Sequence, residues 1–399
     1  MEIWKRNLLV CWFGSFATAA GLSQIAPVLP LYIEHLGIKD TARIEQFSGF
    51  AFGVTFILMA LVSPLWGRAA DKYGRKSMLL RASLGMALVI TCMGFVTDVY
   101  QLIGLRLIQG AVSGYISAAI ILVATQAPEE RSGWALGTLS TGGVGGMLLG
   151  PLIGGYLAET VGLRFVFFGT GALLLVAFTL SVFFIQENFT ASHEKLLSYK
   201  EIWRLIPNPA VLICMFVTTF MLQLALLSIE PIITVYIAQI SYNSEHVALL
   251  SGMVFASSGV ANILAAPRLG RLSDKIGPAK VMLVSLILSG LLFFPQAYVT
   301  NVWQLMVLRF MFGVGAAGLL PSLNSLVKHN SPDSITGRIF GYNQSAQHLG
   351  SFVGSLLGGQ IAALWGIHWV FWVTGLLLLL NAAWVYQTAY RTANEEKAT

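Results

Sequence analysis

The stretch that decides the fold is Gly67-Arg68-Ala69-Ala70-Asp71-Lys72-Tyr73-Gly74-Arg75-Lys76. It lies between two long apolar runs, so a chain that crosses a membrane must leave it, turn and re-enter within about ten residues. A basic turn of this kind is common on the cytoplasmic side of membrane proteins. This one, however, returns 203 positions later as Gly270-Arg271-Leu272-Ser273-Asp274-Lys275-Ile276-Gly277-Pro278. A turn that recurs at half the chain length predicts a duplicated membrane protein.

The composition supports this interpretation. Of the 399 residues, 56% are hydrophobic and 11% are charged, whereas soluble domains carry about 25% charged residues. Runs of about 20 apolar residues are long enough to cross a bilayer as a helix. The sequence contains twelve such runs, at 8–33, 45–66, 77–97, 101–126, 134–158, 163–186, 209–238, 247–267, 279–298, 303–327, 337–361 and 367–389. We therefore predict an all-α membrane protein with twelve transmembrane helices.

The basic residues are concentrated in alternate loops of the predicted topology, so the net charge of +6 does not indicate a nucleic-acid partner. With the amino terminus inside, the loops expected outside hold Lys39 and Arg43, while most other basic residues fall in the alternate loops and at the termini. The positive-inside rule then places both termini in the cytoplasm. The three cysteines all lie within apolar runs, and they are expected to be core residues without a disulfide or metal role.

Further repeats and one charged connection divide the chain. Arg106 recurs as Arg309, and the glycines of the fifth run recur in the eleventh, 203 to 204 residues on. An arginine inside a membrane is costly unless it faces a wet cavity or a partner. The segment 187–208 is the one long, charged connection. The expected domains are 1–186, a six-helix half; 187–208, a cytoplasmic linker; and 209–399, a second six-helix half.

Enzyme motifs are absent from the sequence. We find no Gly-x-Ser-x-Gly, no His-Glu-x-x-His and no nucleotide-binding loop. The run Gly313 to Gly318 matches Gly-x-Gly-x-x-Gly, but that fingerprint requires a preceding strand in a soluble βαβ unit, and helix packing explains it better here. We expect no enzyme activity and no cofactor, so that uphill transport would draw on an ion gradient.

These motifs together resemble the major facilitator superfamily. The stretch 67–76 looks like its loop motif between helices two and three, and Arg106, Gln109 and Gly110 resemble its helix-four motif. Residues 146–155 match the Gly-x-x-x-Gly-Pro-x-x-Gly-Gly pattern of its antiporter branches. Four further stretches look like a subgroup of bacterial multidrug exporters within the twelve-helix drug:H⁺ antiporter family: 4–7, 27–30, 132–143 and 337–345.

The resemblance implies a fold and residue roles. The major facilitator fold would pair two pseudo-symmetric six-helix bundles around a central cavity in the bacterial inner membrane. Asp71 with Arg75 would help to hold one conformation, and Arg106 would take part in proton coupling. The antiporter motif, whose residues are Gly146, Gly150, Pro151, Gly154 and Gly155, would bend helix five and limit leak. Pro278 stands where the first loop has Arg75, which implies a weaker latch in the second half.

A polar stripe on helix four is the main candidate lining of the cavity. Arg106, Gln109, Ser113 and Ser117 recur at three- and four-residue steps, and such a stripe should face protein or water rather than lipid. Interhelical hydrogen bonding is the alternative role. Further candidates for the cavity are Gln24 on helix one, Tyr115 on helix four, Gln223 on helix seven and Asn324 on helix ten.

Glu230 is the candidate proton carrier. It lies inside the seventh apolar run, directly before Pro231. A carboxyl group desolvated there could hold a proton at physiological pH, or it could contact a cationic drug. The alternative is a helix-end carboxylate that reaches the outer interface.

The function expected from these observations is proton-driven export of amphipathic or cationic drugs by alternating access. A dedicated transporter of one metabolite, such as a sugar, a siderophore or a phospho-compound, is the alternative within transport. A membrane receptor is the alternative from another class, although 399 residues leave no room for a signalling domain. The expected partners are small-molecule drugs and the lipid bilayer, and the resemblance implies a monomer.

Overall fold

The computed structural model describes residues 2–189, 203–206, 208–241, 246–332 and 335–390. Within these ranges the chain is helical, with no strand, as the sequence predicts. It divides into two compact units, which are described separately: unit 1 is Met1–His193 with Ser244–Ala256, and unit 2 is Glu194–Asn243 with Ser257–Thr399. The first ten residues of α12 (Val247–Ile276) therefore pack with unit 1.

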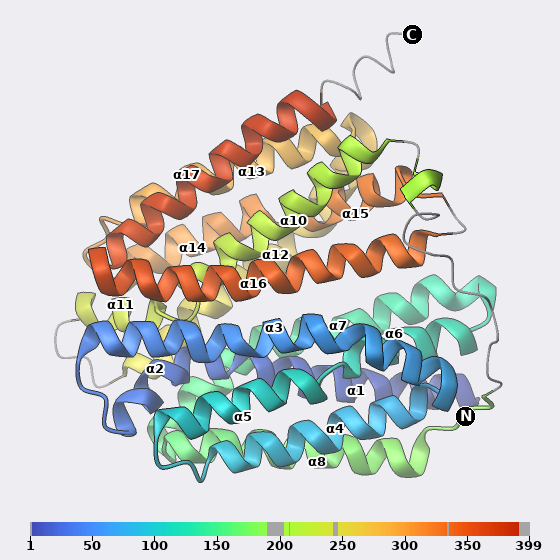
Figure 1. Ribbon diagram of the computed structural model, residues 1–399, viewed down its shortest axis with the longest axis horizontal. Coiled ribbons are helices and arrows are strands. Elements are labelled where there is room, and N and C mark those ends of the chain that lie inside the picture. The colour runs from blue at the N-terminus through green and yellow to red at the C-terminus, as the bar shows by residue number, and fades with distance from the viewer. Residues whose placement is uncertain (1, 190–202, 207, 242–245, 333–334, 391–399) are drawn as a thin grey trace. The chain divides into compact units, whose positions relative to one another are not determined.

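The helices of unit 1 reproduce the first six predicted runs (Figure 1). They are α1 (Ile3–Ser23), α2 (Ile25–His35), α3 (Thr41–Tyr73), α4 (Arg75–Met93), α5 (Val99–Val112), α6 (Tyr115–Gln126), α7 (Glu129–Thr160) and α8 (Leu163–Phe184). The first run is broken into α1 and α2, which meet at an angle of 42°. Pro27 explains the break, because its ring removes a donor and clashes with the carbonyl four residues earlier.

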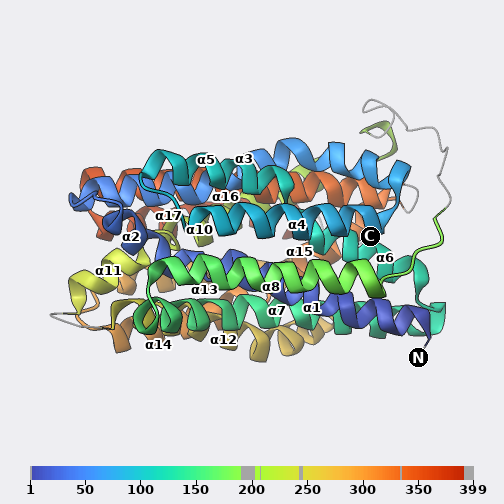
Figure 2. The ribbon, with the colours of Figure 1, turned by 90° about the horizontal axis from the view of Figure 1, so that it is seen from below.

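Unit 2 repeats this pattern (Figure 2). Its helices are α10 (Pro209–Ile229), α11 (Ile233–Ile240), the remainder of α12, α13 (Pro278–Gln296), α14 (Val302–Ala316), α15 (Leu319–His329), α16 (Thr336–Trp365), α17 (Ile367–Val385) and the π-helical turn η1 (Tyr386–Tyr390). The fourth run of unit 1 is broken between α5 and α6, and its counterpart is broken between α14 and α15. The internal duplication read from the sequence is thus visible in the breaks as well as in the helices.

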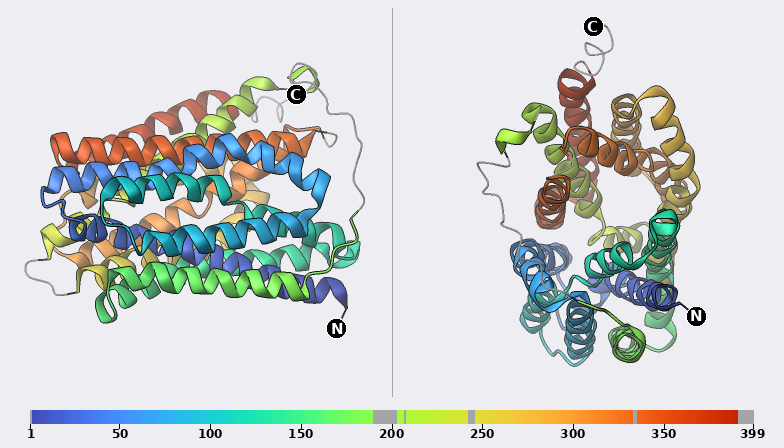
Figure 3. Two further views of the ribbon diagram at one scale, coloured as in Figure 1. Left: turned by 60° about the horizontal axis from the view of Figure 1, so that its bottom comes forward. Right: turned by 90° about the vertical axis from the view of Figure 1, so that its right-hand side faces the viewer.

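Most of these helices are long and apolar enough to cross a membrane. Among the described residues ten meet this standard alone, counting α5 with α6 and α14 with α15 as single spans, and the bent pair α1–α2 makes eleven. The predicted eleventh run forms α16, a 30-residue helix that does not meet this standard. Figure 3 shows, end-on, how the helices within each unit run beside one another.

The predicted first loop is largely helical, which corrects its expected extent. Helix α3 continues to Tyr73, and only Gly74 separates it from α4. Gly67 is accommodated within α3, whereas Gly74 ends the helix with a φ of 84°, in the left-handed region where glycine is favoured. Arg81 also lies outside the turn, in the second turn of α4.

The fourth predicted transmembrane run of each half begins with the same kind of side-chain cap, at α5 and at α14. Asp98 Oδ1 accepts hydrogen bonds from the backbone N–H groups of Tyr100 at 2.8 Å and Gln101 at 2.9 Å. At the equivalent place Asn301 Oδ1 accepts from Gln304 N at 3.0 Å. These side chains satisfy helix-end donors that have no partner within the helix.

We predict that Asp98→Ala lowers the free energy of unfolding by about 1 kcal/mol, the usual cost of losing such a cap. Asp98→Asn retains the acceptor and should unfold close to the wild type. Thermal unfolding of the purified variants in one detergent measures both. Equal loss in the two variants would contradict a role for the acceptor oxygen.

Candidate functional site

Arg106 is the most completely buried charged side chain that the structure describes, with 1% of its surface exposed. Its Nε donates to the carbonyl of Ala51 at 3.0 Å, and its Nη1 donates to Gln109 Oε1 at 2.8 Å. Its guanidinium also lies over the ring of Phe52, 5.2 Å from the centroid. Carbonyl groups and an aromatic face therefore replace the water that a charged group would otherwise need.

Gly110 explains why Arg106 reaches those carbonyls. A Cβ at this position would stand 2.1 Å from the carbonyl oxygen of Thr55, so only glycine lets α5 lie this close to α3. Thr55 Oγ1 in turn donates to the carbonyl of Arg106 at 3.0 Å. The helix-four motif thus fastens α5 to α3, and Gln109 serves as an acceptor for Arg106 in the same contact.

Ser113 and Ser117, the last two residues of the predicted polar stripe on helix four, differ in burial. Ser113 is buried and donates to the carbonyl of Gly110 at 2.9 Å, whereas Ser117 is exposed. The break after Val112 frees carbonyl groups, and two side chains that the sequence did not single out supply donors: Trp66 Nε1 reaches Ala111 at 2.6 Å, and Arg81 Nη2 reaches Ser113 at 3.0 Å. Arg81 also stacks on Trp66, 3.6 Å from the ring centroid.

Arg309, the counterpart of Arg106, has a different environment. It is 5% exposed, and its Nε and Nη2 atoms have no hydrogen-bond partner among the described residues. Phe312 stands where unit 1 has Gln109, and its ring centroid lies 5.9 Å from the guanidinium. The guanidinium of Arg309 is therefore buried with unpaired hydrogen-bond donors. Such burial costs free energy unless an opposite charge nearby stabilises the group.

Glu230 is the acidic side chain whose charge acts on Arg309. It follows the last residue of α10, where the chain breaks before α11, and its side chain is half-buried. The charges of Glu230 and Arg309 act on each other within unit 2. Gln223, two helical turns earlier, is buried and accepts from Ser351 Oγ at 3.5 Å. Sequence reasoning singled out both residues, but it did not connect Glu230 with Arg309.

The remaining cavity candidates differ in their burial. Gln24 is buried at the break between α1 and α2. Tyr115 is fully buried and shares a hydrogen bond of 3.2 Å with Ser181, packed against Gly14 of α1. Asn324 is exposed on α15.

The antiporter motif uses two faces of α7. A Cβ on Gly146, Gly150 or Gly154 would stand 2.2 to 2.7 Å from atoms of α1 or of Gln24. On the other face, a Cβ on Gly155 would stand 2.5 Å from the carbonyl oxygen of Ala248 in α12, within unit 1. Pro151 adds to this face, since its carbonyl oxygen would be 2.4 Å from a Cβ on Gly252. Both faces require backbone-to-backbone contact, which small residues permit.

The loop motif lies at the end of α3. Asp71 is in its last turns, with a side chain outside the described part of the structure. The N–H of Arg75 donates to Glu187 Oε1 at 2.8 Å. Sequence reasoning assigned Glu187 to the linker and missed this contact, since no local pattern joins residues 112 positions apart.

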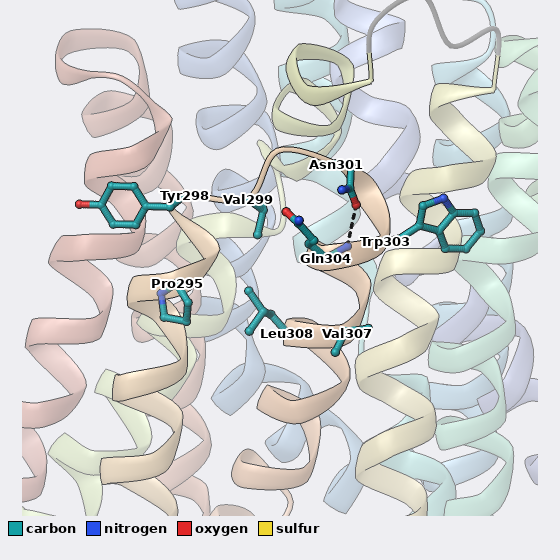
Figure 4. A pocket seen from close by; sticks show the side chains of 8 residues that line it. All are labelled: Pro295, Tyr298, Val299, Asn301, Trp303, Gln304, Val307 and Leu308. Atoms are coloured by element: carbon teal, nitrogen blue, oxygen red, sulfur yellow. Dashed lines mark hydrogen bonds between the residues drawn. The ribbon is translucent and has the colours of Figure 1, made fainter.

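Two surface grooves occupy equivalent places in the two units. The groove in unit 2 has a volume of about 680 Å³ and lies between α13 and α14, where Tyr298 and Trp303 flank an otherwise mainly apolar lining (Figure 4). The groove in unit 1, of about 450 Å³, lies between α4 and α5 and includes Cys92 and Gln101. Neither groove contains a residue predicted for the transport cavity. No group of His, Cys, Asp or Glu side chains that could hold a metal ion occurs among the described residues.

Comparison with known proteins gives consistent results. The sequence model of the Major Facilitator Superfamily matches residues 11–261 and 215–399. The multidrug resistance proteins MdtG of Salmonella paratyphi A and Salmonella arizonae are each 46% identical to this chain over 389 residues, which is 97% of this chain and 96% of the relative. The predicted resemblance to bacterial multidrug exporters is thereby confirmed.

Solved structures show the same fold at low identity. A bacterial homologue of the human lysosomal transporter Spinster, inward-facing and occupied, has a TM-score of 0.80 at 13% identity, covering 97% of each chain. The nucleoside transporter NupG has a TM-score of 0.77 at 14% identity, covering 97% of this chain and 99% of its own. Because the family model, near-full-length relatives and the repeated helix pattern agree, this chain belongs to the Major Facilitator Superfamily.

Proposed function

We propose that the protein is a proton-coupled multidrug efflux transporter that exports amphipathic or cationic drugs by alternating access. The observation that carries this proposal is the 46% identity to multidrug resistance protein MdtG across 97% of the chain. We further propose that it is a multi-pass protein of the bacterial inner membrane, acts as a monomer and has both termini in the cytoplasm. The distribution of Lys and Arg among the predicted loops supports this orientation.

The substrate class follows from the scarcity of charge within the membrane. The buried charged side chains that the structure describes are Glu45, Arg106 and Arg309, with Glu230 half-buried. Arg106 is already bonded to carbonyl groups of α3 and to Gln109. A site with so few polar groups binds by apolar and aromatic contact, which favours breadth over strict selectivity.

Glu230 is our proposed proton carrier, with Arg309 as its counter-charge. When Glu230 is ionised, the buried guanidinium of Arg309 compensates its charge. When Glu230 takes up a proton from outside, that attraction ends and the charge of the buried Arg309 is left uncompensated. The two protonation states therefore favour different arrangements of α10 and α14. Proton binding can then shift the balance between two conformations of the transporter, which is how proton flow would be coupled to transport.

Transport by purified protein in liposomes tests the proposal. With an imposed pH gradient, uptake of a fluorescent cationic dye is followed together with internal pH, and an Arg106→Ala protein serves as the inactive comparison. We expect dye movement in exchange for protons. No dye movement across several chemically different drugs would overturn multidrug export and lead to a screen of single metabolites.

We predict that Glu230→Gln abolishes dye movement driven by the pH gradient while expression and dye binding persist, because glutamine cannot release a proton. Glu34→Gln, which neutralises an exposed carboxylate of α2, is the matched control and should transport normally. Normal proton-driven export by the Glu230→Gln protein would refute the assignment.

We also predict that Gly154→Val lowers stability by about 1–3 kcal/mol through overpacking against Gln24 and that it lowers transport. Gly143→Val on the same helix is the control, because nothing lies within 4 Å of its added Cβ. Thermal unfolding and dye transport of both variants check this. Equal behaviour of the two would show that close packing at Gly154 is unimportant.

A further inference from the structure

The start of α4 and the end of α8 exchange hydrogen bonds through two charged side chains. Glu187 Oε1 accepts from the N–H of Arg75 at 2.8 Å, and its Oε2 accepts from the N–H of Lys76 at 2.7 Å. In return, Lys76 Nζ donates to the carbonyls of Val182 at 3.0 Å and Ile185 at 2.7 Å. We call this arrangement of Lys76 and Glu187 the reciprocal cap.

Each charge in the reciprocal cap meets the helix end that suits it. The N-terminus of a helix has unpaired N–H groups and a partial positive charge, and the C-terminus has unpaired carbonyls and a partial negative charge. The carboxylate therefore belongs at the start of α4 and the ammonium group at the end of α8. All four bonds are charge-assisted, and such bonds are stronger than neutral ones.

Amide side chains fix the residue next to Glu187. Asn7 Nδ2 donates to the carbonyl of Gln186 at 2.7 Å, and Asn7 Oδ1 accepts from the N–H of Gln186 at 3.1 Å. Gln126 Nε2 also donates to that carbonyl, at 3.0 Å. The chain beyond α8 is thus held by α1 and α6 as well as by α4.

Gly74 is fitted to the reciprocal cap in two ways. Its backbone φ of 84° is one that residues with a side chain rarely adopt. An added Cβ would also stand 2.8 Å from Glu187 Oε2, so the absence of a side chain makes room for the carboxylate. The second glycine of the loop motif therefore serves this contact as well as the turn.

The described part of the second half has no counterpart of the reciprocal cap. The positions 203 residues after Arg75, Lys76 and Glu187 are Pro278, Ala279 and Tyr390, listed here in the same order. Pro278 begins α13 and has no N–H, so one of the two donors that Glu187 satisfies in unit 1 does not exist there. Among the described residues, the reciprocal cap therefore occurs in the half that carries Asp71 and Arg75.

We propose that Lys76 and Glu187 are positioning residues of the transport cycle. They hold Arg75, and with it the loop motif, to the point at which the predicted linker leaves unit 1. The loop motif and the start of the linker then move as one body. This inference rests on the proposed transport function. It adds a physical connection, made by Lys76 and Glu187, between the loop motif and the start of the predicted linker.

The test is a kinetic comparison in proteoliposomes, with rates referred to the amount of monodisperse protein. Glutamine can accept from only one of the two N–H groups, so Glu187→Gln should lower the maximal rate of dye export about tenfold, the factor that one charge-assisted hydrogen bond represents. KM should stay unchanged, because no drug contact is removed. Glu187→Asp, which retains the charge, should recover part of the rate.

A second variant separates positioning from folding. Lys76→Met keeps the apolar stem but loses both bonds to α8, and it should show the same loss of maximal rate. The double variant Lys76→Met/Glu187→Gln should be no slower than the slower single variant, because the two side chains serve one contact. Glu2→Gln, which removes an exposed ion pair with Lys5 at the same end of unit 1, should be unaffected.

The outcomes distinguish this inference from the proposed function. Wild-type protein that moves no drug contradicts the function itself. An active wild type together with unchanged rates in Glu187→Gln and Lys76→Met overturns the positioning role. A raised KM with an unchanged maximal rate, or losses that multiply in the double variant, overturns it equally.

Discussion

The close approach of α7 to α1 is the contact on which unit 1 depends. In a bilayer the lipid tails are as apolar as the side chains, so helices gain little from hydrophobic burial and associate through packing. Glycines at 146, 150 and 154 bring the two backbones together over three turns. Gly155 then lets the other face of α7 meet the carbonyl oxygen of Ala248 on α12. The antiporter motif thus sets where two neighbouring helices lie.

Close packing also governs where charge is tolerated. Gly110 brings α5 against α3, and only then do the carbonyls of Ala51 and Phe52 come within reach of Arg106. The equivalent glycine, Gly313, lies against Ser258 in the same manner. Arg309 nevertheless keeps unpaired donors at Nε and Nη2, the two atoms that in Arg106 donate to the carbonyls of Ala51 and Phe52. The duplicated backbone is retained, while the two arginines differ in the hydrogen bonds that they make.

Much of the fold was predictable from the sequence because its signals are local or repeated. Apolar runs give the spans, Pro27 gives the break between α1 and α2, and an offset of 203 to 204 residues reveals the duplication. The predicted extent of the first turn was wrong. The apolar run ends at the membrane surface, whereas the helix α3 continues beyond it to Tyr73 and ends at Gly74. The partners of Arg106 and Glu187 were not predictable, since backbone groups leave no mark in the sequence and the contacts join distant segments. The roles of Asp71, Glu230 and the cavity residues stay predictions.

The groove between α4 and α5 has a chemical consequence. Cys92 lines it and is exposed, whereas Cys11 and Cys214 are buried. A thiol reagent that dissolves in lipid therefore meets one accessible sulfur on the native chain, at the helix pair next to the Arg106 contact. The protein carries its own attachment point for a spectroscopic reporter, so movements of α4 against α5 during turnover can be followed without first removing or adding a cysteine.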